Sequence, residues 1–398
     1  MKLKFPQERE EWSLDIVSLL AVIGESAMSA HSQPLTASIL CLLPRFLPAP
    51  QALLRHSRPT RLPAIPAHIV AIYSGTLLVE LNHFANLVYN VTLPNFSVRE
   101  IRISHKKGLE GTLQDEKSLR KRWYKTPKGV IHARPSSPLS ILSVTSFLLS
   151  VGLCVWAILL EDGVAVIAIL VVSFSSTIIG LSNLWHPNLT VRKRKSAVPA
   201  GDLVIRTRQG AFIIVRCTEE VARELYTGTE LCSYVVGDQI FRALVGVATF
   251  LLMSAVILMG NATWTMQAAM GGTYVLLNGC YQIAALLPNK WQWNLERYEV
   301  KRLTSHKADT YTQALWYAIR ATTQTNWVQV SHAAPESEAW RAWISQAGDN
   351  MHSNPDWDSQ VALDHLLNCE KSENGYQSST DDFEEVRHPE RFDEKVSK

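Results

Sequence analysis

Four long runs of apolar residues, arranged in two pairs, dominate the hydrophobic pattern of this 398-residue chain. Leu139 to Leu160 is followed by Gly163 to Trp185, and Ala243 to Gly260 is followed by Trp264 to Leu287, with only a few residues inside each pair. Each run has about 20 residues, enough for a helix to cross a hydrocarbon core of about 30 Å. The pattern predicts an all-α membrane protein with a four-helix transmembrane core, made of hairpins at 139–185 and 243–287.

Basic residues are concentrated between the hairpins and before them. Residues 94–138 contain eleven Lys and Arg against four acids, with the highest density at Arg120, Lys121, Arg122 and Lys125. Residues 186–242 contain nine more, including the run 192–195, whereas the short turns inside the hairpins contain none. The positive-inside rule therefore places both long loops and the C-terminal tail in the cytosol. It does not specify which membrane the protein occupies.

The average composition changes this picture little. A net charge of +3 gives no reason to expect a nucleic-acid partner, so the lipid bilayer is the partner that the pattern predicts. The six cysteines show no paired spacing, and we therefore expect neither a disulfide framework nor a metal site. No cofactor is indicated.

Residues 1–93 contain shorter apolar stretches, at 12–30, 35–54 and 67–93, each interrupted by polar side chains. A crossing at 67–93 would place Arg55, Arg58 and Arg61 on the wrong side for the positive-inside rule. We therefore expect helices that lie at the cytosolic interface or are partly embedded. The alternative is one or two additional spans.

Glu80 and His83 form the one candidate catalytic pair in the apolar part of the chain. They stand three residues apart, so a helix over 67–93 would place them on adjoining faces, together with Asn86. A Glu-x-x-His pair can ligate a metal, but a complete site needs further carboxylate or His ligands, which this stretch lacks. The simpler interpretation is that these polar residues form the water-exposed face of an interfacial helix.

A small ββα unit is predicted within 186–242. Leu203 to Arg208 and Ala211 to Cys217 are rich in β-branched residues, and Gly210 suits the tight turn between them. Thr218 has the side chain of a helix N-cap. Three arginines of this unit are candidates for contact with phosphate or lipid headgroups: Arg206, Arg208 and Arg216. A solvated basic face is the alternative.

The tail after the last apolar run divides into two parts. Residues 288–368 are rich in tryptophan, beginning with Trp291 and Trp293, where indole rings favour the headgroup level. We expect cytosolic helices there. Residues 369–398 are acidic and poor in large apolar groups, which predicts disorder.

Several segments together resemble a family of uncharacterised polytopic integral membrane proteins of filamentous fungi. The resemblance covers roughly Leu139 to Ala347, and the segments that carry it are 201–206, 218–226, 293–300, 312–316 and 333–340. It implies the order of spans, ββα unit and Trp-rich tail, but no catalytic residue or cofactor. Its genomic setting implies a role tied to secondary metabolism or the cell surface.

The sequence supports three functions, which we rank in order. A non-enzymatic accessory, scaffold or regulatory protein comes first, because the runs carry few ionisable groups and could present the cytosolic parts to a protein partner. An auxiliary transporter of a small metabolite comes second, with Asn278, Tyr281 and Gln282 as candidate ligand-binding residues. A membrane-embedded enzyme that uses Glu80 and His83 comes third. Four spans could also form a pore as a homo-oligomer.

Overall fold

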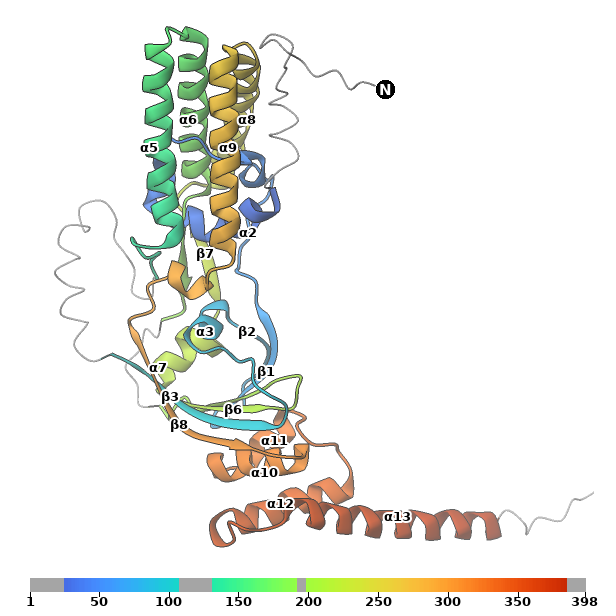
Figure 1. Cartoon of the computed structure of the whole chain (residues 1–398). Helices are drawn as coiled ribbons and strands as arrows, with labels where there is room; N and C mark the ends of the chain where they lie inside the picture. The colour runs from blue at the N-terminus through green and yellow to red at the C-terminus, as the bar shows by residue number, and fades with distance from the viewer. Residues whose placement is uncertain (1–24, 107–130, 192–197, 385–398) are drawn as a thin grey trace, which may run out of the picture.

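The computed structural model describes residues 25–106, 131–191 and 198–384. Long helices form an elongated bundle, a curved sheet lies below it, and short helices cover the far side of the sheet (Figure 1). The helices of the bundle are α5 (Pro138–Leu159), α6 (Gly163–Asn183), α8 (Asp238–Gly260) and α9 (Trp264–Ala285), with α2 (Glu25–Thr36), η2 (Ile39–Leu42) and η3 (Pro50–Leu53) packed among them. The basic residues at 120–125 and 192–195 lie outside the described residues.

Three helices in the described part of the chain are long and apolar enough to cross a membrane: α5, α6 and α8. The fourth, α9, is as long as its neighbours but less apolar, because it carries Gln267, Asn278 and Gln282 among its residues. It packs along α5 and returns the chain to the end of the bundle at which the sheet lies. The prediction of an all-α protein with a four-helix transmembrane core is therefore wrong.

A six-stranded sheet is the main feature that the sequence did not predict. Its strands lie in the order β2-β1-β5-β6-β3-β8. Their bounds are β1 (Ile65–Ala71), β2 (Leu77–Leu81), β5 (Leu203–Arg206), β6 (Phe212–Cys217), β3 (Ser97–His105) and β8 (Tyr298–Lys307). The pair β3–β6 is parallel and the other pairs are antiparallel.

The expected helix over 67–93 is instead a hairpin followed by a short helix. Gly75 adopts a φ of 65° in the turn between β1 and β2, a conformation that glycine enters without steric cost. Strand β2 ends at Leu81, and Asn82 then caps α3 (His83–Val88) through a hydrogen bond from Phe84 N to its side-chain oxygen, 2.8 Å long. The stretch is apolar because β1 and α3 pack into the core, not because it meets lipid.

Two hydrophobic cores cover the two faces of the sheet. The face toward the bundle packs against α3, α7 (Glu219–Ala222) and η4, a π turn over Arg223–Thr227. The opposite face packs against α10 (Tyr311–Thr322), α11 (Asn326–Val330) and α12 (Glu338–Ser353). Apolar side chains on both sides are typical of a sheet at the centre of a three-layer domain.

The predicted ββα unit is present at β5, β6 and α7, but it is not a separate insert. Strands β5 and β6 lie at the centre of the sheet, with β1 on one side and β3 on the other. Thr218 occupies the N-cap position of α7, although its side chain makes no capping hydrogen bond. The unit is therefore held in place by hydrogen bonding to β1 and β3, which are distant in the sequence.

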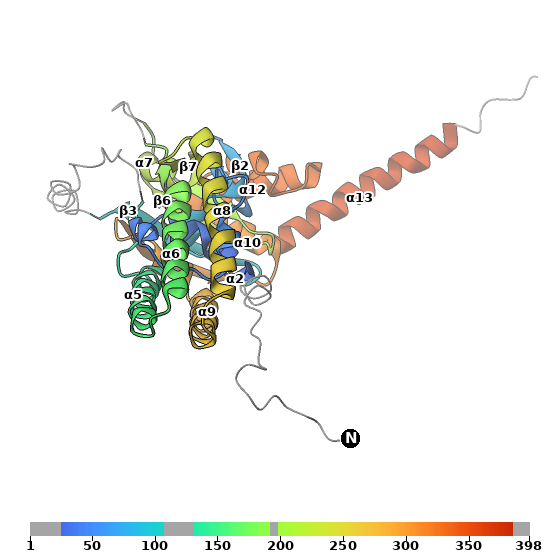
Figure 2. The ribbon, with the colours of Figure 1, turned by 90° about the horizontal axis from the view of Figure 1, so that it is seen from above.

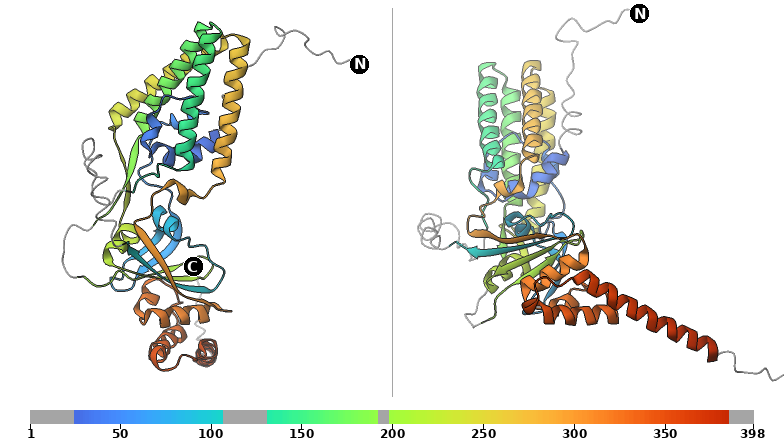
Figure 3. Two further views of the ribbon diagram at one scale, coloured as in Figure 1. Left: turned by 60° about the vertical axis from the view of Figure 1, so that its left-hand side comes forward. Right: turned by 60° about the horizontal axis from the view of Figure 1, so that its bottom comes forward.

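A two-stranded ribbon joins the sheet domain to the bundle. Strands β4 (Trp185–Leu189) and β7 (Glu230–Tyr234) pair antiparallel, with Trp185 opposite Tyr234. The ribbon continues directly from the end of α6 and leads into the start of α8 (Figure 3). The domain and the bundle are thus connected by paired strands as well as by single chain segments.

The tail differs from its prediction in two places. Tyr298–Lys307 forms the edge strand β8 where helices were expected, because it pairs along nearly the whole of β3. Helix α13 (Ser359–Glu384) continues past residue 369, where disorder was predicted, in a stretch without proline; residues 385–398 lie outside the described residues, and disorder stays a prediction for them. Figure 2 shows α13 extending away from the rest of the molecule.

Candidate functional site: a segment inside the bundle that carries a buried arginine

The chain between α2 and β1 enters the helical bundle and leaves it again. Residues 37–54 lie among the long helices in the half of the bundle nearer the sheet (Figures 1 and 3). Phe46 packs in the same core as Leu153 and Met270, and its ring meets Tyr274 edge-on at 6.5 Å between centroids. We call residues 37–54 the re-entrant segment.

The deepest point of the re-entrant segment is about halfway along the helices. Phe46 N donates to Ser150 Oγ at 2.6 Å, and Ser146 donates its hydroxyl hydrogen to Phe46 O. Ser150 lies 12 residues after the first residue of α5, which corresponds to about 18 Å along a helix of 22 residues. An irregular backbone at this depth requires polar partners inside the protein, and serines provide them.

Local sequence explains why the re-entrant segment is not a long helix. Pro44, Pro48 and Pro50 each lack a backbone N–H and interrupt a regular helix, so only the short turns η2 and η3 form. Gly180 of α6 makes room for it, since a Cβ at that position would lie 2.1 Å from Cys41 O. At its exit, Asn183 Nδ2 donates to Leu53 O at 3.1 Å.

Arg45 lies on the re-entrant segment next to its deepest residue and is almost completely buried, with 2% of its surface exposed. Its backbone N–H donates to Ser176 Oγ at 3.3 Å, and its Nη1 donates to Leu40 O at 2.8 Å. Its Nε has no hydrogen-bond partner. The guanidinium is therefore enclosed by protein and only partly satisfied.

No carboxylate in the described part of the chain forms an ion pair with Arg45; the ion pairs found there involve other basic groups. A guanidinium stays protonated in proteins, so the positive charge remains inside the bundle. Burying an ion without a partner costs several kcal/mol or more, and a low-dielectric interior increases its attraction for an anion. The site thus has the electrostatics of an anion-binding site.

A polar residue of α9 lies beside this charge, and a residue of α2 contacts it in turn. Tyr281 is fully buried and is near enough to interact electrostatically with Arg45. The ring of His31 lies 6.3 Å from that of Tyr281, and His31 Nε2 is 3.2 Å from Tyr281 O. His31 itself is 5% exposed. A cation and the Tyr281 side chain are therefore collected in one enclosed region, and His31 packs against Tyr281.

The predicted ligand-binding residues of α9 are only partly brought together there. Asn278 and Tyr281 are buried on the inner side of α9, but Gln282 is exposed. The sequence pattern did not indicate Arg45 as functional, because Arg45 is one of several polar and proline residues that interrupt the apolar stretch 35–54. The signal was present: a lone Arg between prolines within apolar sequence is costly unless protein surrounds it.

The predicted catalytic pair is not assembled. Glu80 lies on β2 with its side chain exposed, whereas His83 is the first residue of α3 and is half-buried. Burial lowers the pKa of His83, and the hydrogen bond with the Pro63 backbone counteracts this in part. Asn86 accepts a hydrogen bond from Val91 N at 3.3 Å. Among the described residues, no group of three or more His, Cys, Asp and Glu is placed to hold a metal.

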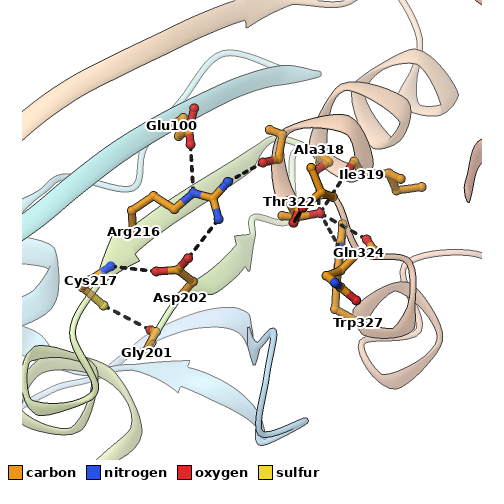
Figure 4. A network of polar contacts seen from close by, with 12 residues as sticks. Glu100, Gly201, Asp202, Arg216, Cys217, Ala318, Ile319, Thr322, Gln324 and Trp327 are labelled. Carbon is orange, nitrogen blue, oxygen red and sulfur yellow. Dashed lines mark hydrogen bonds and ion pairs between the residues drawn. The ribbon is translucent and has the colours of Figure 1, made fainter. Parts of the chain in front are cut away.

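The three arginines proposed for phosphate contact have different environments. Arg216 donates to Glu100 and Asp202, each at 2.9 Å, and to Ala321 O, and this network joins the sheet to α10 (Figure 4). Arg206 donates to His332 O at 2.7 Å. Arg208 is exposed in the turn after β5. Arg206 and Arg208 line one open depression of about 760 Å³, which does not include Arg216.

Comparison of the chain with protein-family models, with curated proteins and with solved structures gives no match. The resemblance to a fungal membrane family stays a prediction. The geometry of the molecule therefore carries the functional argument.

Proposed function

We propose that this multi-pass membrane protein is an auxiliary transporter of a small anionic metabolite. Its bundle, in which α5, α6 and α8 are long and apolar enough to cross the membrane and α9 returns the chain beside them, binds the solute at Arg45. The sheet domain lies on the cytosolic side, in agreement with the basic residues of the loops that lead to it. The single observation that carries the proposal is the buried, unpaired Arg45 on an irregular segment inside the bundle.

Two physical features favour transport over simple anchoring. An ionisable group inside a membrane bundle is costly, and such groups typically mark solute or ion pathways. Transporter sites also combine irregular backbone with long helices near the middle of the bilayer. Because Arg45 is enclosed here, this conformation corresponds to an occluded state, and exchange of the solute requires the re-entrant segment to move.

The proposal is tested by uptake into liposomes that contain the purified full-length protein. Labelled chloride, inorganic phosphate and citrate serve as probes of monovalent, polyvalent and carboxylate anions. We expect uptake of at least one probe, and we expect Arg45→Gln to reduce that uptake more than about ten-fold, since removal of a buried charge partner costs about 2–5 kcal/mol.

Arg208→Gln is the matched control, because it removes the same charge from an exposed turn outside the bundle. Arg45→Lys keeps the charge but loses the planar fork of donors, so we expect an intermediate rate. No uptake of any probe by wild-type protein, or equal uptake by Arg45→Gln, would contradict the proposal.

A second function, a non-enzymatic scaffold or regulatory role, is favoured by the sheet domain. Chain segments from before, between and after the long helices all contribute strands to it, so it forms a substantial body outside the bundle. Helix α13 also extends outward from it, with Val361 62% exposed. This arrangement would suit presentation of a surface to a protein partner.

One genetic experiment separates the two functions. A strain that lacks the gene is complemented with wild-type chain or with Arg45→Gln, and its extracellular metabolites and cell-surface properties are compared. Transport predicts that Arg45→Gln fails to restore the wild-type profile at equal expression. A scaffold role predicts full restoration. The enzymatic alternative is not proposed, because Glu80 lies on a strand and His83 on the helix that follows it, so the two side chains do not share one helix as that alternative required.

A further inference from the structure

We propose a second binding site, for the headgroup of an anionic phospholipid, where the bundle meets the sheet domain. A cavity of about 360 Å³ opens there. Its apolar lining comes from α3, from the start of β8 and from the chain that follows α9, and its rim carries Arg134 and Lys290. The inference relies on the proposed membrane location of the bundle but not on transport through it.

Backbone pairing holds the two basic residues at the ends of neighbouring helices. Ala133 and Trp293 form an isolated antiparallel bridge, Arg134 N donates to Gln292 O at 2.8 Å, and Asn294 N donates to His132 O at 2.9 Å. Arg134 precedes α5 by four residues, and Lys290 follows α9 by five. Both charges therefore lie at the level at which the bundle ends, which is the headgroup level of the proposed bilayer.

The charges on this rim are unequal. Arg134 forms an ion pair with Glu296, which also lines the cavity. Lys290 is exposed, and no carboxylate in the described part of the chain pairs with it. The rim consequently carries one uncompensated positive charge. The N-terminal end of α5 adds a partial positive charge nearby.

The apolar lining fits a lipid better than a soluble phosphate compound. Leu87, Leu295 and Val300 provide aliphatic surface, and Trp291 is 45% exposed beside them. Indole rings favour the boundary between headgroups and acyl chains, and basic pockets at the cytosolic ends of membrane helices bind acidic headgroups. The combined chemistry is that of a phosphate over Lys290 with glycerol and upper acyl carbons against the aliphatic surface.

Native mass spectrometry of the full-length protein in detergent tests the site. We expect phosphatidylserine to bind more tightly than phosphatidylcholine, and Lys290→Gln to weaken phosphatidylserine binding about five-fold, since one basic residue contributes about 1 kcal/mol. Lys307→Gln, an exposed lysine at the far end of β8, is the matched control and should bind as wild type. Because Lys290 is exposed, the substitution leaves the core unchanged.

Three results would overturn the inference. They are equal affinity of wild-type protein for the two lipids, unchanged phosphatidylserine binding by Lys290→Gln, and displacement of phosphatidylserine by an equal concentration of glycerol 3-phosphate, which would indicate a soluble ligand. Because this assay measures lipid and the liposome assay measures solute uptake, failure of one proposal is distinguishable from failure of the other.

Discussion

Asp162 shows how a single carboxylate holds the far ends of the two hairpins together. It caps α6 by accepting a hydrogen bond from Ala165 N at 3.0 Å. It also accepts from Thr263 N and from Thr263 Oγ1, each at 2.8 Å, across the turn before α9. Burial alone would raise the pKa of Asp162, but these hydrogen bonds outweigh burial and lower it.

Substitution Asp162→Asn is expected to destabilise the protein by about 1–3 kcal/mol, because one carboxylate oxygen becomes an NH₂ group that cannot accept from Thr263. Since the pKa is lowered in the folded state, this stabilisation is complete above the unfolded value of about 4 and is lost as the pH falls through the folded value. Thermal unfolding in detergent between about pH 7 and about pH 3 measures both effects. Glu161→Gln, at an exposed neighbour, should behave as wild type; equal unfolding of Asp162→Asn and wild type would contradict the assignment.

Arg216 gives a second prediction at the residue scale. Arg216→Met leaves Glu100 and Asp202 without their cation and removes the hydrogen bond to Ala321 O, so we expect a loss of about 3 kcal/mol. The triple change with Glu100→Gln and Asp202→Asn removes the unpaired charges as well and should recover part of that loss. Denaturant unfolding measures both. A triple variant less stable than Arg216→Met would show that the network is not the cause.

Single residues were the least predictable level of this molecule. The sequence identified Arg206, Arg208 and Arg216 as one basic group, but the strands give each a different environment, and carboxylates from β3 and the loop before β5 neutralise only Arg216. Arg45 could not be identified from the sequence, because its environment is formed by distant residues. Serines of α5 and α6, 100 or more residues away in the chain, bind the backbone of Arg45 and of its neighbour Phe46.

At the scale of elements, the β4–β7 ribbon depends on Arg58. This side chain forms an ion pair with Asp238, donates to Val236 O at 2.8 Å and lies 4.3 Å from the ring centroids of Tyr234 and Phe241. It thus joins the end of the ribbon to the first turn of α8. From the sequence alone, Arg58 carried information only through its charge relative to the membrane.

We expect Arg58→Ala to destabilise the protein by about 2 kcal/mol, through loss of the cation–π contacts and the buried hydrogen bond. The melting temperature in detergent measures this change. Arg55→Ala removes an exposed arginine three residues earlier and should leave that temperature unchanged. Equal melting temperatures for the two variants would show that Arg58 does not hold the junction.

Elements with local signals were predicted well, and elements that depend on distant pairing were not. The predicted ββα unit corresponds to β5, β6 and α7 because its turn and β-branched residues are contiguous. Strands β3 and β8 are separated by almost 200 residues and contain many charges, so neither has a strong pattern by itself. The Ser74-Gly75 turn was a usable signal for the β1–β2 hairpin, but continuous apolarity around it favoured a helix.

At the scale of the whole molecule, the hydrophobic pattern identified the long helices but not the sheet domain attached to them. The average composition of the chain conceals a domain with a core on each face of a mixed sheet, because its strands are spread before, between and after the apolar runs. The path of residues 37–54 through the bundle encloses Arg45, so the proposed anion site depends on this path.

Cross-linking of the re-entrant segment to α5 tests this path most directly. Phe46→Cys and Ser150→Cys are combined with Cys154→Ala, and membranes are treated with a short bifunctional thiol reagent. Because Phe46 N lies 2.6 Å from Ser150 Oγ, we expect efficient cross-linking within one chain, detected as a linked peptide pair by mass spectrometry. Phe46→Cys with Leu276→Cys, which is 56% exposed on the outside of α9, should not cross-link. Absence of the Phe46–Ser150 link in folded protein would contradict this path of the re-entrant segment and with it the proposed anion site.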